Sequence, residues 1–269
     1  MGDTSFSLTV HGSDVMSTSR SVRGRLLGKR LLFKGVIRVL AVSSFTRDLF
    51  LEKFSDFDRD QVSVANPAPS EDMIQLSLNF GDIVRSHRPV LRILTVARLD
   101  PRKGHLNAFA ALQQLVRDQG VSFEWVIVGD PVDKEYQEVL LGEFAVASFS
   151  ITLCGSLGTE ELGEEYRKAD IFLLAGEDYP KRVEGFGIVY LEAGLFGLPS
   201  VGTLVGGTSE AVVDGITGLM SRPGDMPALL YNLKRLVSNR NLRSKMGIAA
   251  RDRAISFNWE QTASATFPD

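Results

Sequence analysis

The sequence predicts an α/β protein whose strands run parallel within each sheet. From Arg92 to Asp225, short apolar runs alternate with amphipathic stretches of helical length, and such strand–helix–strand alternation produces parallel sheets with right-handed crossovers. The runs are also apolar at nearly every position, as in strands that helices cover on both faces. The five expected strands are residues 92–97, 123–129, 151–155, 171–175 and 199–203.

Helices are expected between and after these strands. Thr159, followed by Glu160 and Glu161, supplies a cap and an acidic first turn for one of them. Asp225, which follows a Pro-Gly pair, caps another. The expected helices are residues 104–119, 159–168, 188–197, 225–237 and 239–256, of which 188–197 is apolar nearly all round and fits a buried helix.

The first part of the chain has a weaker pattern. Apolar runs occur only at residues 5–10, 36–42 and 61–67, which is too few strands for a complete doubly wound lobe. Residues 69–89 have a poorer pattern between two prolines, and we expect them to form a linker. A lobe boundary near His87 follows from this change of pattern.

Size, charge and cysteine content exclude several classes of protein. The chain has 269 residues and a formal net charge of −3, which argues against nucleic acid as a partner. The single cysteine, Cys154, cannot form an internal disulfide, and three scattered histidines add no zinc-type cluster. No apolar stretch reaches the roughly 20 residues that span a bilayer, and the N-terminus lacks a secretory signal pattern. We therefore expect a cytoplasmic location.

Residues 20–38 are rich in basic side chains. Between Asp14 and Asp48 there are eight Lys and Arg residues and no acidic residue, with leucines interleaved. A basic amphipathic helix of this kind can lie on an anionic membrane surface, here the inner face of the cell membrane. A solvated helix face packed on its own sheet explains the pattern equally well, so both interpretations stay open.

Residues 184–192 have the layout of a site for an anionic, polyhydroxylated ligand. Seven residues separate Glu184 from Glu192, and Gly185-Phe186-Gly187 among them opens the expected helix. A glycine-flanked helix start offers N–H groups and positive dipole to a phosphate, and carboxylates accept hydrogen bonds from hydroxyls. Glu192 lies inside an apolar helix, where an unpaired carboxylate is rare. We expect Glu192 to face a ribose diol and Glu184 to face a sugar.

Two cations follow the expected strand 92–97. Arg98 ends the strand, and Lys103 directly precedes the next helix. An isolated pair of this kind is usually only solvated. The carboxyl ends of parallel strands meet at one edge of a sheet, so both cations are expected near residues 184–187, where they suit a diphosphate.

Three further residues lie at the ends of expected strands. Gly129 and the Gly155-Ser156-Leu157 turn can wall a base and a sugar, or can merely reverse the chain. His11 ends the strand 5–10, and a lone histidine in such a place is more often structural than catalytic.

These motifs resemble those of the retaining glycosyltransferases of family 4, also called group 1 glycosyltransferases. The resemblance covers nearly the whole chain, and its motifs follow the family's order: TVHGSD, VLAVSSFTRD, VSVANP, VARLDPRKGH, GSLGTEELGEEYRKADIFLL, EGFGIVYLEAGLFGLPSVGT, GGTSEAVVDGITGL and FNWEQ. It implies the GT-B fold of two facing Rossmann-like lobes. The implied parts are a partial N-terminal lobe (1–86), a complete C-terminal nucleotide-sugar-binding lobe (87–256) and a segment that crosses back (257–269).

The resemblance also implies a role for each matching residue. Arg98 and Lys103 match the basic pair that binds the donor diphosphate and stabilises the departing nucleotide. Glu184 matches the glutamate that contacts the donor sugar, and Glu192 matches the one that holds the ribose. The remaining matches are Gly185, Phe186 and Gly187 for sugar and phosphate, Leu157 for the base and His11 for the donor sugar near the reacting carbon.

The implied reaction transfers a sugar from a nucleotide-sugar donor to an acceptor hydroxyl with retention at the anomeric carbon. The resemblance implies a hexosyltransferase with a UDP- or GDP-linked donor and a carbohydrate or lipid-linked acceptor, acting in cell-surface polysaccharide or glycolipid synthesis. No metal and no cofactor is expected, because cationic side chains and the helix dipole take the place that a metal fills elsewhere.

The chain departs from the family pattern at its start. A complete first lobe has several more βα units before residues 5–10, so we expect this lobe to be truncated, or to be completed by a second chain. The strand that precedes the EGFG motif also departs from the family pattern. It is followed by Ala175-Gly176, where the family usually has Pro-Ser. The alternative hypothesis is therefore a non-catalytic nucleotide-sugar-binding module or partner subunit.

Overall fold

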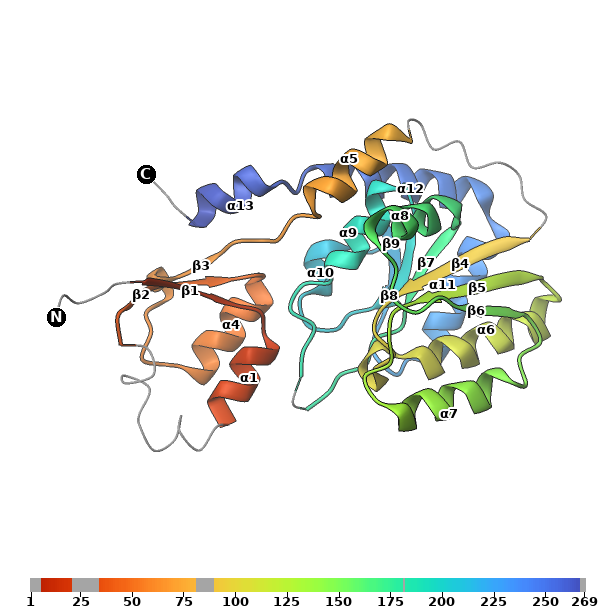
Figure 1. The fold of residues 1–269 in the computed structure, drawn as a ribbon, viewed down its shortest axis with the longest axis horizontal. Helices are drawn as coiled ribbons and strands as arrows, with labels where there is room; N and C mark the ends of the chain where they lie inside the picture. The colour runs from red at the N-terminus through yellow and green to blue at the C-terminus, as the bar shows by residue number, and fades with distance from the viewer. Residues whose placement is uncertain (1–5, 21–33, 81–89, 181, 267–269) are drawn as a thin grey trace.

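Two parallel sheets form the two lobes of the molecule (Figure 1). The computed structural model describes residues 6–20, 34–80, 90–180 and 182–266. The first sheet has the strand order β1-β2-β3, and its strands are β1 (Phe6–Val10), β2 (Val36–Ala41) and β3 (Val62–Val64). The second has the order β6-β5-β4-β7-β8-β9, with β4 (Leu91–Val96), β5 (Phe123–Val128), β6 (Ser150–Leu153), β7 (Ile171–Leu174), β8 (Ser200–Thr203) and β9 (Gly218–Ser221).

The second sheet confirms the predicted parallel α/β fold. All five expected strands are present, and each pairs in parallel with its neighbours. Every residue of β7 and β8 is buried, which explains why these segments are apolar at each position. The pattern did not predict β9, which has four residues and pairs with β8 at Ser200↔Gly218.

Helices cover both faces of the second sheet (Figure 1). One face carries α6 (His105–Gln119), α7 (Lys134–Phe144) and α11 (Met226–Ser238), which share a buried cluster with Trp125 and Ile127. The other face carries α8 (Thr159–Lys168), α9 (Ile188–Leu195) and α12 (Arg240–Ile255). The short α10 (Thr208–Ala211) joins β8 to β9. Two apolar layers therefore hold the sheet edge rigidly in place.

The sheet of the first lobe packs on α1 (Ser13–Arg20) and α4 (Ser44–Lys53). Val39 and Phe50 lie at the centre of this smaller core, and the 3₁₀ helix η1 (Arg59–Gln61) leads into β3. The predicted basic helix over residues 20–38 is wrong at its end, because residues 36–38 belong to β2 and Arg38 donates to Ser63 Oγ at 2.8 Å. Residues 21–33, the rest of that prediction, lie outside the described residues.

The prediction of a linker over residues 69–89 is also wrong in part. Residues 71–79 form helix α5 (Glu71–Asn79), which Ser70 caps by accepting from Met73 N. Met73 is buried with the side chains of α8 and α9, so α5 packs on the second lobe. The predicted boundary near His87 falls outside the described residues and stays a prediction.

The chain returns to the first lobe at its end. Helix α13 (Trp259–Thr266) lies beside β3 (Figure 1). Trp259 Nε1 donates to the carbonyl of Pro69 at 2.9 Å, and Thr262 Oγ1 donates to the carbonyl of Asn66 at 2.7 Å. Two connections therefore join the lobes, one before α5 and one at α13. Within the described residues, no helix combines the length and the apolar character that crossing a bilayer requires.

Candidate active site

The strand order places a candidate site at the carboxyl ends of β4 and β7. These neighbours mark the point where the order of the sheet reverses, since β5 and β6 lie on one side and β8 and β9 on the other. In open α/β sheets, ligands bind in the crevice at this switch point. The loops that leave the two strands carry Arg98 and Lys103 in one case and residues 175–187 in the other.

The loop after β4 is folded tightly against the loop after β7. Residues Pro101–Lys103 form the 3₁₀ helix η2, which Asp100 caps by accepting from Arg102 N at 3.0 Å. Gly104 then takes a left-handed conformation (φ 67°), and a Cβ there would lie 1.6 Å from the carbonyl oxygen of Ala175. Only glycine permits this approach. It brings Lys103 next to the segment that leads to Glu184.

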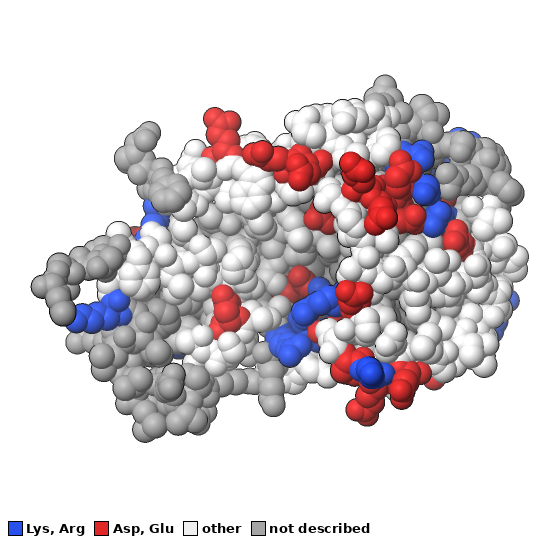
Figure 2. All heavy atoms as spheres, in the orientation of Figure 1, with Lys and Arg blue, Asp and Glu red and all other residues white. Residues whose placement is uncertain are grey.

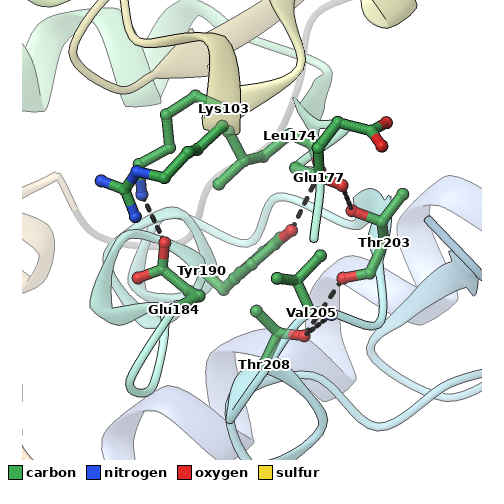
Figure 3. Close-up of a pocket in the computed structure, with 10 residues that line it drawn as sticks. Lys103, Leu174, Glu177, Glu184, Tyr190, Thr203, Val205 and Thr208 are labelled. Carbon is green, nitrogen blue, oxygen red and sulfur yellow. Dashed lines mark hydrogen bonds and ion pairs between the residues drawn. The ribbon is translucent and has the colours of Figure 1, made fainter. Parts of the chain in front are cut away.

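Lys103 and Glu184 form an ion pair at the centre of the site. Lys103 Nζ lies 2.5 Å from Glu184 Oε2, and the two side chains point toward each other in Figure 3. Their side chains are 16% and 24% exposed, respectively, so solvent screens the pair only in part. The predicted diphosphate cation and the predicted sugar-binding carboxylate are therefore in direct contact.

A small pocket adjoins this ion pair (Figure 3). Three lining residues are held in place by hydrogen bonds from their hydroxyl groups to backbone carbonyl groups. Tyr190 Oη donates to the carbonyl of Leu174 at 3.1 Å, Thr203 Oγ1 donates to that of Gly176 at 2.5 Å, and Thr208 Oγ1 donates to that of Thr203 at 3.1 Å. The lining residues are Arg102, Lys103, Leu174, Gly176, Glu177, Glu184, Tyr190, Thr203, Val205 and Thr208.

Helix α9 begins beside the pocket without a side-chain cap. Gly187 is its N-cap residue, has a positive φ of 91° and makes no side-chain capping bond. Phe186 is buried and packs edge-on against Phe257 at 5.6 Å between ring centroids. The first N–H groups of a helix need partners, and an anion satisfies them. The structure thus places Gly185, Phe186 and Gly187 as a turn that ends next to Lys103 and Glu184.

Glu192 lies within α9 and faces the neighbouring helix α8. Its Oε2 accepts a hydrogen bond of 2.9 Å from the hydroxyl of Tyr166. Burial raises the pKa of Glu192, and the Tyr166 hydrogen bond lowers it, with burial the larger cause. The partner of this carboxylate within the apolar interface is thus a tyrosine, whereas contact with a ribose stays a prediction. Glu192 does not line the pocket beside Glu184.

The first lobe contacts the glycine turn directly. Ser13 Oγ donates to the carbonyl of Val183 at 3.1 Å and accepts from Val183 N at 3.2 Å. Thr46 Oγ1 donates to the carbonyl of Gly185 at 3.3 Å. A Cβ at Gly185 would lie 2.2 Å from the carbonyl oxygen of His11. His11 is exposed at the end of β1 and therefore lies across the glycine turn, on the first-lobe side of the site.

Arg98, Gly129 and Leu157, like Glu192, do not line the pocket. Arg98 is exposed, and its guanidinium has no hydrogen bond or ion pair to the described residues. Gly129 has a positive φ of 142°, packs against the carbonyl of Ala97 and donates to Gly155 O at 2.8 Å. Leu157 is partly buried against the apolar cluster of α8 and α9. The turns after β4, β5 and β6 thus adjoin one another along the sheet edge.

Sequence reasoning missed several residues of the site. Arg102 lines the pocket. It lies between Arg98 and Lys103 in the sequence, and this position in the same loop was the signal that could have identified it. Tyr190 and Thr208 belong to the quoted motifs, but nothing in the spacing showed that their hydroxyls point toward the pocket. Ser13 and Thr46 are 170 and 139 residues away from their partners Val183 and Gly185, so only the tertiary structure reveals them.

Charged side chains of both signs gather where the lobes meet (Figure 2). Asp100 binds Arg102 at 3.2 Å and Arg182 at 3.5 Å. Although burial raises the pKa of Asp100, backbone and side-chain bonds from Arg102 and the charges of Arg102 and Arg182 lower it below its usual value overall. Among the described residues, no group of three or more His, Cys, Asp or Glu side chains is arranged to hold a metal ion.

A comparison with known families establishes the kinship of the chain. The profile of the family described as "Glycosyl transferases group 1" matches residues 86–253, which is more than half of the sequence. The chain is a group 1 glycosyltransferase by family. The motifs quoted from the second lobe lie within this matched region.

Curated relatives of this group 1 protein include bacterial proteins named as glycosyltransferases. A "D-inositol 3-phosphate glycosyltransferase" of Frankia alni is 29% identical over 258 residues, which cover 89% of this chain and 60% of that protein. A "GDP-mannose-dependent alpha-(1-6)-phosphatidylinositol monomannoside mannosyltransferase" of Mycolicibacterium smegmatis is 33% identical over 179 residues, covering 64% and 44%. The chain therefore spans about three fifths or less of the length of these relatives.

Solved structures of similar fold agree with the GT-B prediction. Anabaena Alr3699/HepE in complex with UDP and glucose superposes with a TM-score of 0.76 at 18% identity, covering 97% of this chain and 70% of that one. A glycosyltransferase from Rickettsia africae superposes with a TM-score of 0.74 at 22% identity, covering 97% and 68%. The group 1 chain thus has the GT-B fold.

Proposed function

We propose that this group 1 protein transfers a sugar from a nucleotide-sugar donor to an acceptor hydroxyl, with retention at the anomeric carbon. The observation that carries the proposal is the Lys103–Glu184 pair, which lies beside the uncapped start of α9. This combination offers a cation and free N–H groups to a diphosphate and a carboxylate to sugar hydroxyls. The complex of the Anabaena protein with UDP and glucose supports the same ligand class.

In the proposed complex, the donor diphosphate lies against the N–H groups of residues 185–187. Lys103 exchanges part of its contact with Glu184 for a phosphate oxygen, and the exposed Arg98 supplies a second positive charge. Glu184 then accepts hydrogen bonds from the sugar. Glu192 turns from Tyr166 toward the ribose, and the turns at Gly129 and Leu157 form the wall beside the base.

The proposed reaction breaks the bond between the anomeric carbon and the diphosphate oxygen. The acceptor hydroxyl attacks on the same face, its oxygen forms the new glycosidic bond, and its proton passes to the departing diphosphate. Lys103, Arg98 and the α9 dipole stabilise the negative charge that develops on that leaving group. His11 contacts the donor sugar from the first-lobe side, and the closeness of its carbonyl oxygen to Gly185 supports this role. We propose that no metal or other cofactor takes part.

We further propose a lipid-linked or carbohydrate acceptor and a role in cell-surface glycolipid or polysaccharide synthesis, in the cytoplasm or on the inner membrane face. Relatives named for inositol phosphate and for a phosphatidylinositol mannoside support this choice. The names also support UDP- or GDP-linked donors, because one relative is GDP-mannose-dependent and one similar structure holds UDP-glucose. Contact of residues 20–38 with an anionic membrane belongs to the same proposal.

A non-catalytic nucleotide-sugar-binding module or partner subunit is the alternative. One observation favours it: every residue that lines the pocket belongs to the second lobe, from Arg102 to Thr208. Donor binding therefore needs little from the first lobe. In that case a second chain supplies the acceptor side.

A binding panel followed by a transfer assay separates the two hypotheses. Thermal shifts with UDP, GDP, ADP and their sugars measure binding, and radiolabelled sugar with a lipid-phosphate acceptor measures transfer. Binding with transfer, and an unchanged anomeric configuration by NMR, supports the retaining enzyme. Binding without transfer supports the module, and the absence of any nucleotide-dependent shift contradicts both.

A further inference from the structure

The carboxylate of Glu210 joins the two lobes at a helix end. Glu210 belongs to α10 in the second lobe, yet its Oε2 accepts from Ser44 N at 3.0 Å and its Oε1 accepts from Phe45 N at 3.2 Å. Ser44 and Phe45 are the first two residues of α4 in the first lobe. Asn66 Nδ2, at the end of the first sheet, lies 3.5 Å from the same carboxylate.

Helix α4 depends on this carboxylate to complete its N-terminus. Ser43 Oγ accepts from Thr46 N at 2.9 Å, and the carbonyl of Ser43 accepts from Arg47 N at 2.9 Å. Glu210 accepts hydrogen bonds from the two remaining N–H groups of the first turn, those of Ser44 and Phe45. A helix start leaves N–H groups without intrahelical partners and favours a negative charge. The Arg47 bond is the first intrahelical one, so the opposite lobe satisfies two of the three N–H groups from Ser44 to Thr46.

The same contact closes a ring of hydrogen bonds around the glycine turn of the site. Gly207 N, three residues before Glu210, donates to the carbonyl of Glu184 at 2.9 Å. Thr46, in the helix turn that Glu210 caps, donates to the carbonyl of Gly185 at 3.3 Å. Residues 184–185 are therefore held on one side by the α10 segment and on the other by α4.

Hydrogen bonds from Arg253 hold the backbone of Glu210 in place. Arg253 in α12 donates to the carbonyl of Glu210 and, at 3.0 Å, to the carbonyl of Ala211. Burial lowers the pKa of the Arg253 guanidinium, which the charge of Glu210 partly offsets. The carboxylate thus projects from a rigid support toward the first lobe.

We propose that Glu210 is a positioning residue, which keeps the first lobe closed on residues 183–185 and thereby fixes Glu184 against Lys103. The inference rests on the proposed function for its catalytic consequence, but its structural part stands independently. Glu210 lies outside the set of residues that line the pocket. It acts through α4, Thr46 and the carbonyl of Gly185.

Hydrogen exchange tests the structural part without any ligand. In Glu210→Ala, we expect the amides of Ser44 and Phe45 to exchange about fivefold faster, the usual effect of losing a helix cap. The decisive probe is Val183, whose N–H bonds to Ser13 of the first lobe. We expect its exchange to accelerate too, with an intermediate rate in Glu210→Gln, which keeps an acceptor oxygen. Ser209→Ala, a change of an exposed neighbour, should leave all three amides unaffected.

Steady-state kinetics test the catalytic consequence. For Glu210→Ala we expect kcat to fall by about tenfold or more through misplacement of the site, while the Kd of the nucleoside diphosphate alone rises by a smaller factor. Faster exchange at Ser44 and Phe45 with unchanged Val183 exchange and unchanged kcat would overturn the proposal. If the wild-type chain transfers no sugar but Val183 responds as expected, the positioning role stands and the proposed function fails.

Discussion

At the scale of single residues, the site depends on the charges of Lys103 and Glu184. Their opposite charges lie 2.5 Å apart. A phosphate and a sugar hydroxyl therefore compete with an existing ion pair, and the two side chains contribute to different parts of the donor.

The roles of Lys103 and Glu184 can be distinguished by comparing the binding of a nucleoside diphosphate with that of a nucleotide sugar. Lys103→Ala should weaken both the nucleoside diphosphate and the nucleotide sugar about tenfold, or ~1.4 kcal/mol. Glu184→Gln should weaken the nucleotide sugar by a similar factor but spare the diphosphate, because it removes only the sugar contact. Titration calorimetry measures both, with the surface variant Lys134→Ala as control. Equal affinities for wild type and Lys103→Ala would remove the proposed phosphate site.

His105 is a second residue whose surroundings make a measurable prediction. Its ring is fully buried, and neither ring nitrogen has a hydrogen-bond partner among the described residues. Burial lowers its pKa from 6.5 to about 4. The unfolded chain therefore binds a proton at a higher pH than the folded chain, and stability rises with pH across this window.

We expect this histidine to cost about 2 kcal/mol of stability when the pH falls from 7 to 5. Urea unfolding at the two pH values measures the loss. In His105→Phe the loss should shrink by that amount, because the replacement does not titrate. The exposed His11→Ala serves as the matched control and should keep the wild-type dependence. An identical pH dependence in His105→Phe would show that the buried ring is not the cause.

At the scale of elements, α8 and α9 are joined by one polar contact within an apolar interface. Tyr166 is fully buried, stacks on Phe196 at 5.5 Å and donates to Glu192. A carboxylate inside an apolar helix requires such a partner. The hydrogen bond from the buried Tyr166 hydroxyl therefore allows Glu192 to lie within this apolar interface.

Removal of that hydroxyl should destabilise the protein. Tyr166→Phe leaves the ring stack intact but leaves Glu192 without its donor, so we expect the free energy of unfolding to fall by about 1–3 kcal/mol. Tyr136→Phe is the control, since the residue is buried but its hydroxyl makes no hydrogen bond to the described residues. Urea denaturation compares them. A loss in Tyr166→Phe no larger than in the control would contradict the role assigned to this contact.

At the scale of the whole molecule, Gly207 lies between the glycine turn and the first lobe. Its φ of −83° is open to any residue. A Cβ there would nevertheless lie 2.1 Å from the carbonyl oxygen of Gly185 and 2.9 Å from Ser43 Oγ. The restriction is therefore steric and comes from the other lobe and the glycine turn together.

Gly207→Ala should push these segments apart without straining its own backbone. We expect donor binding to weaken by about tenfold and the free energy of unfolding to fall by 1–3 kcal/mol, as in other overpacked sites. Gly142→Ala, on an exposed helix face with nothing within 4 Å of the added carbon, should be neutral or slightly stabilising. Wild-type affinity in Gly207→Ala would mean that the lobes can move apart at no cost to the site.

The sequence by itself determined the parallel second sheet, the family and, of the helices that cover this sheet, α6, α8, α9, α11 and α12 but not α7. Strands buried on both faces must be apolar at every position, and the carboxyl ends of parallel strands must share one edge, so local pattern was enough to bring Lys103, Glu184 and Gly187 together. It did not predict β9 or α5, because their segments are short or only weakly patterned. Only the tertiary structure decided which groups these residues contact: Tyr166 for Glu192, Ser13 and Thr46 for the segment 183–185, and Glu210 for the start of α4. These partners lie far apart along the chain or on different lobes, and hydrogen-bond geometry between such groups leaves no periodic trace in sequence.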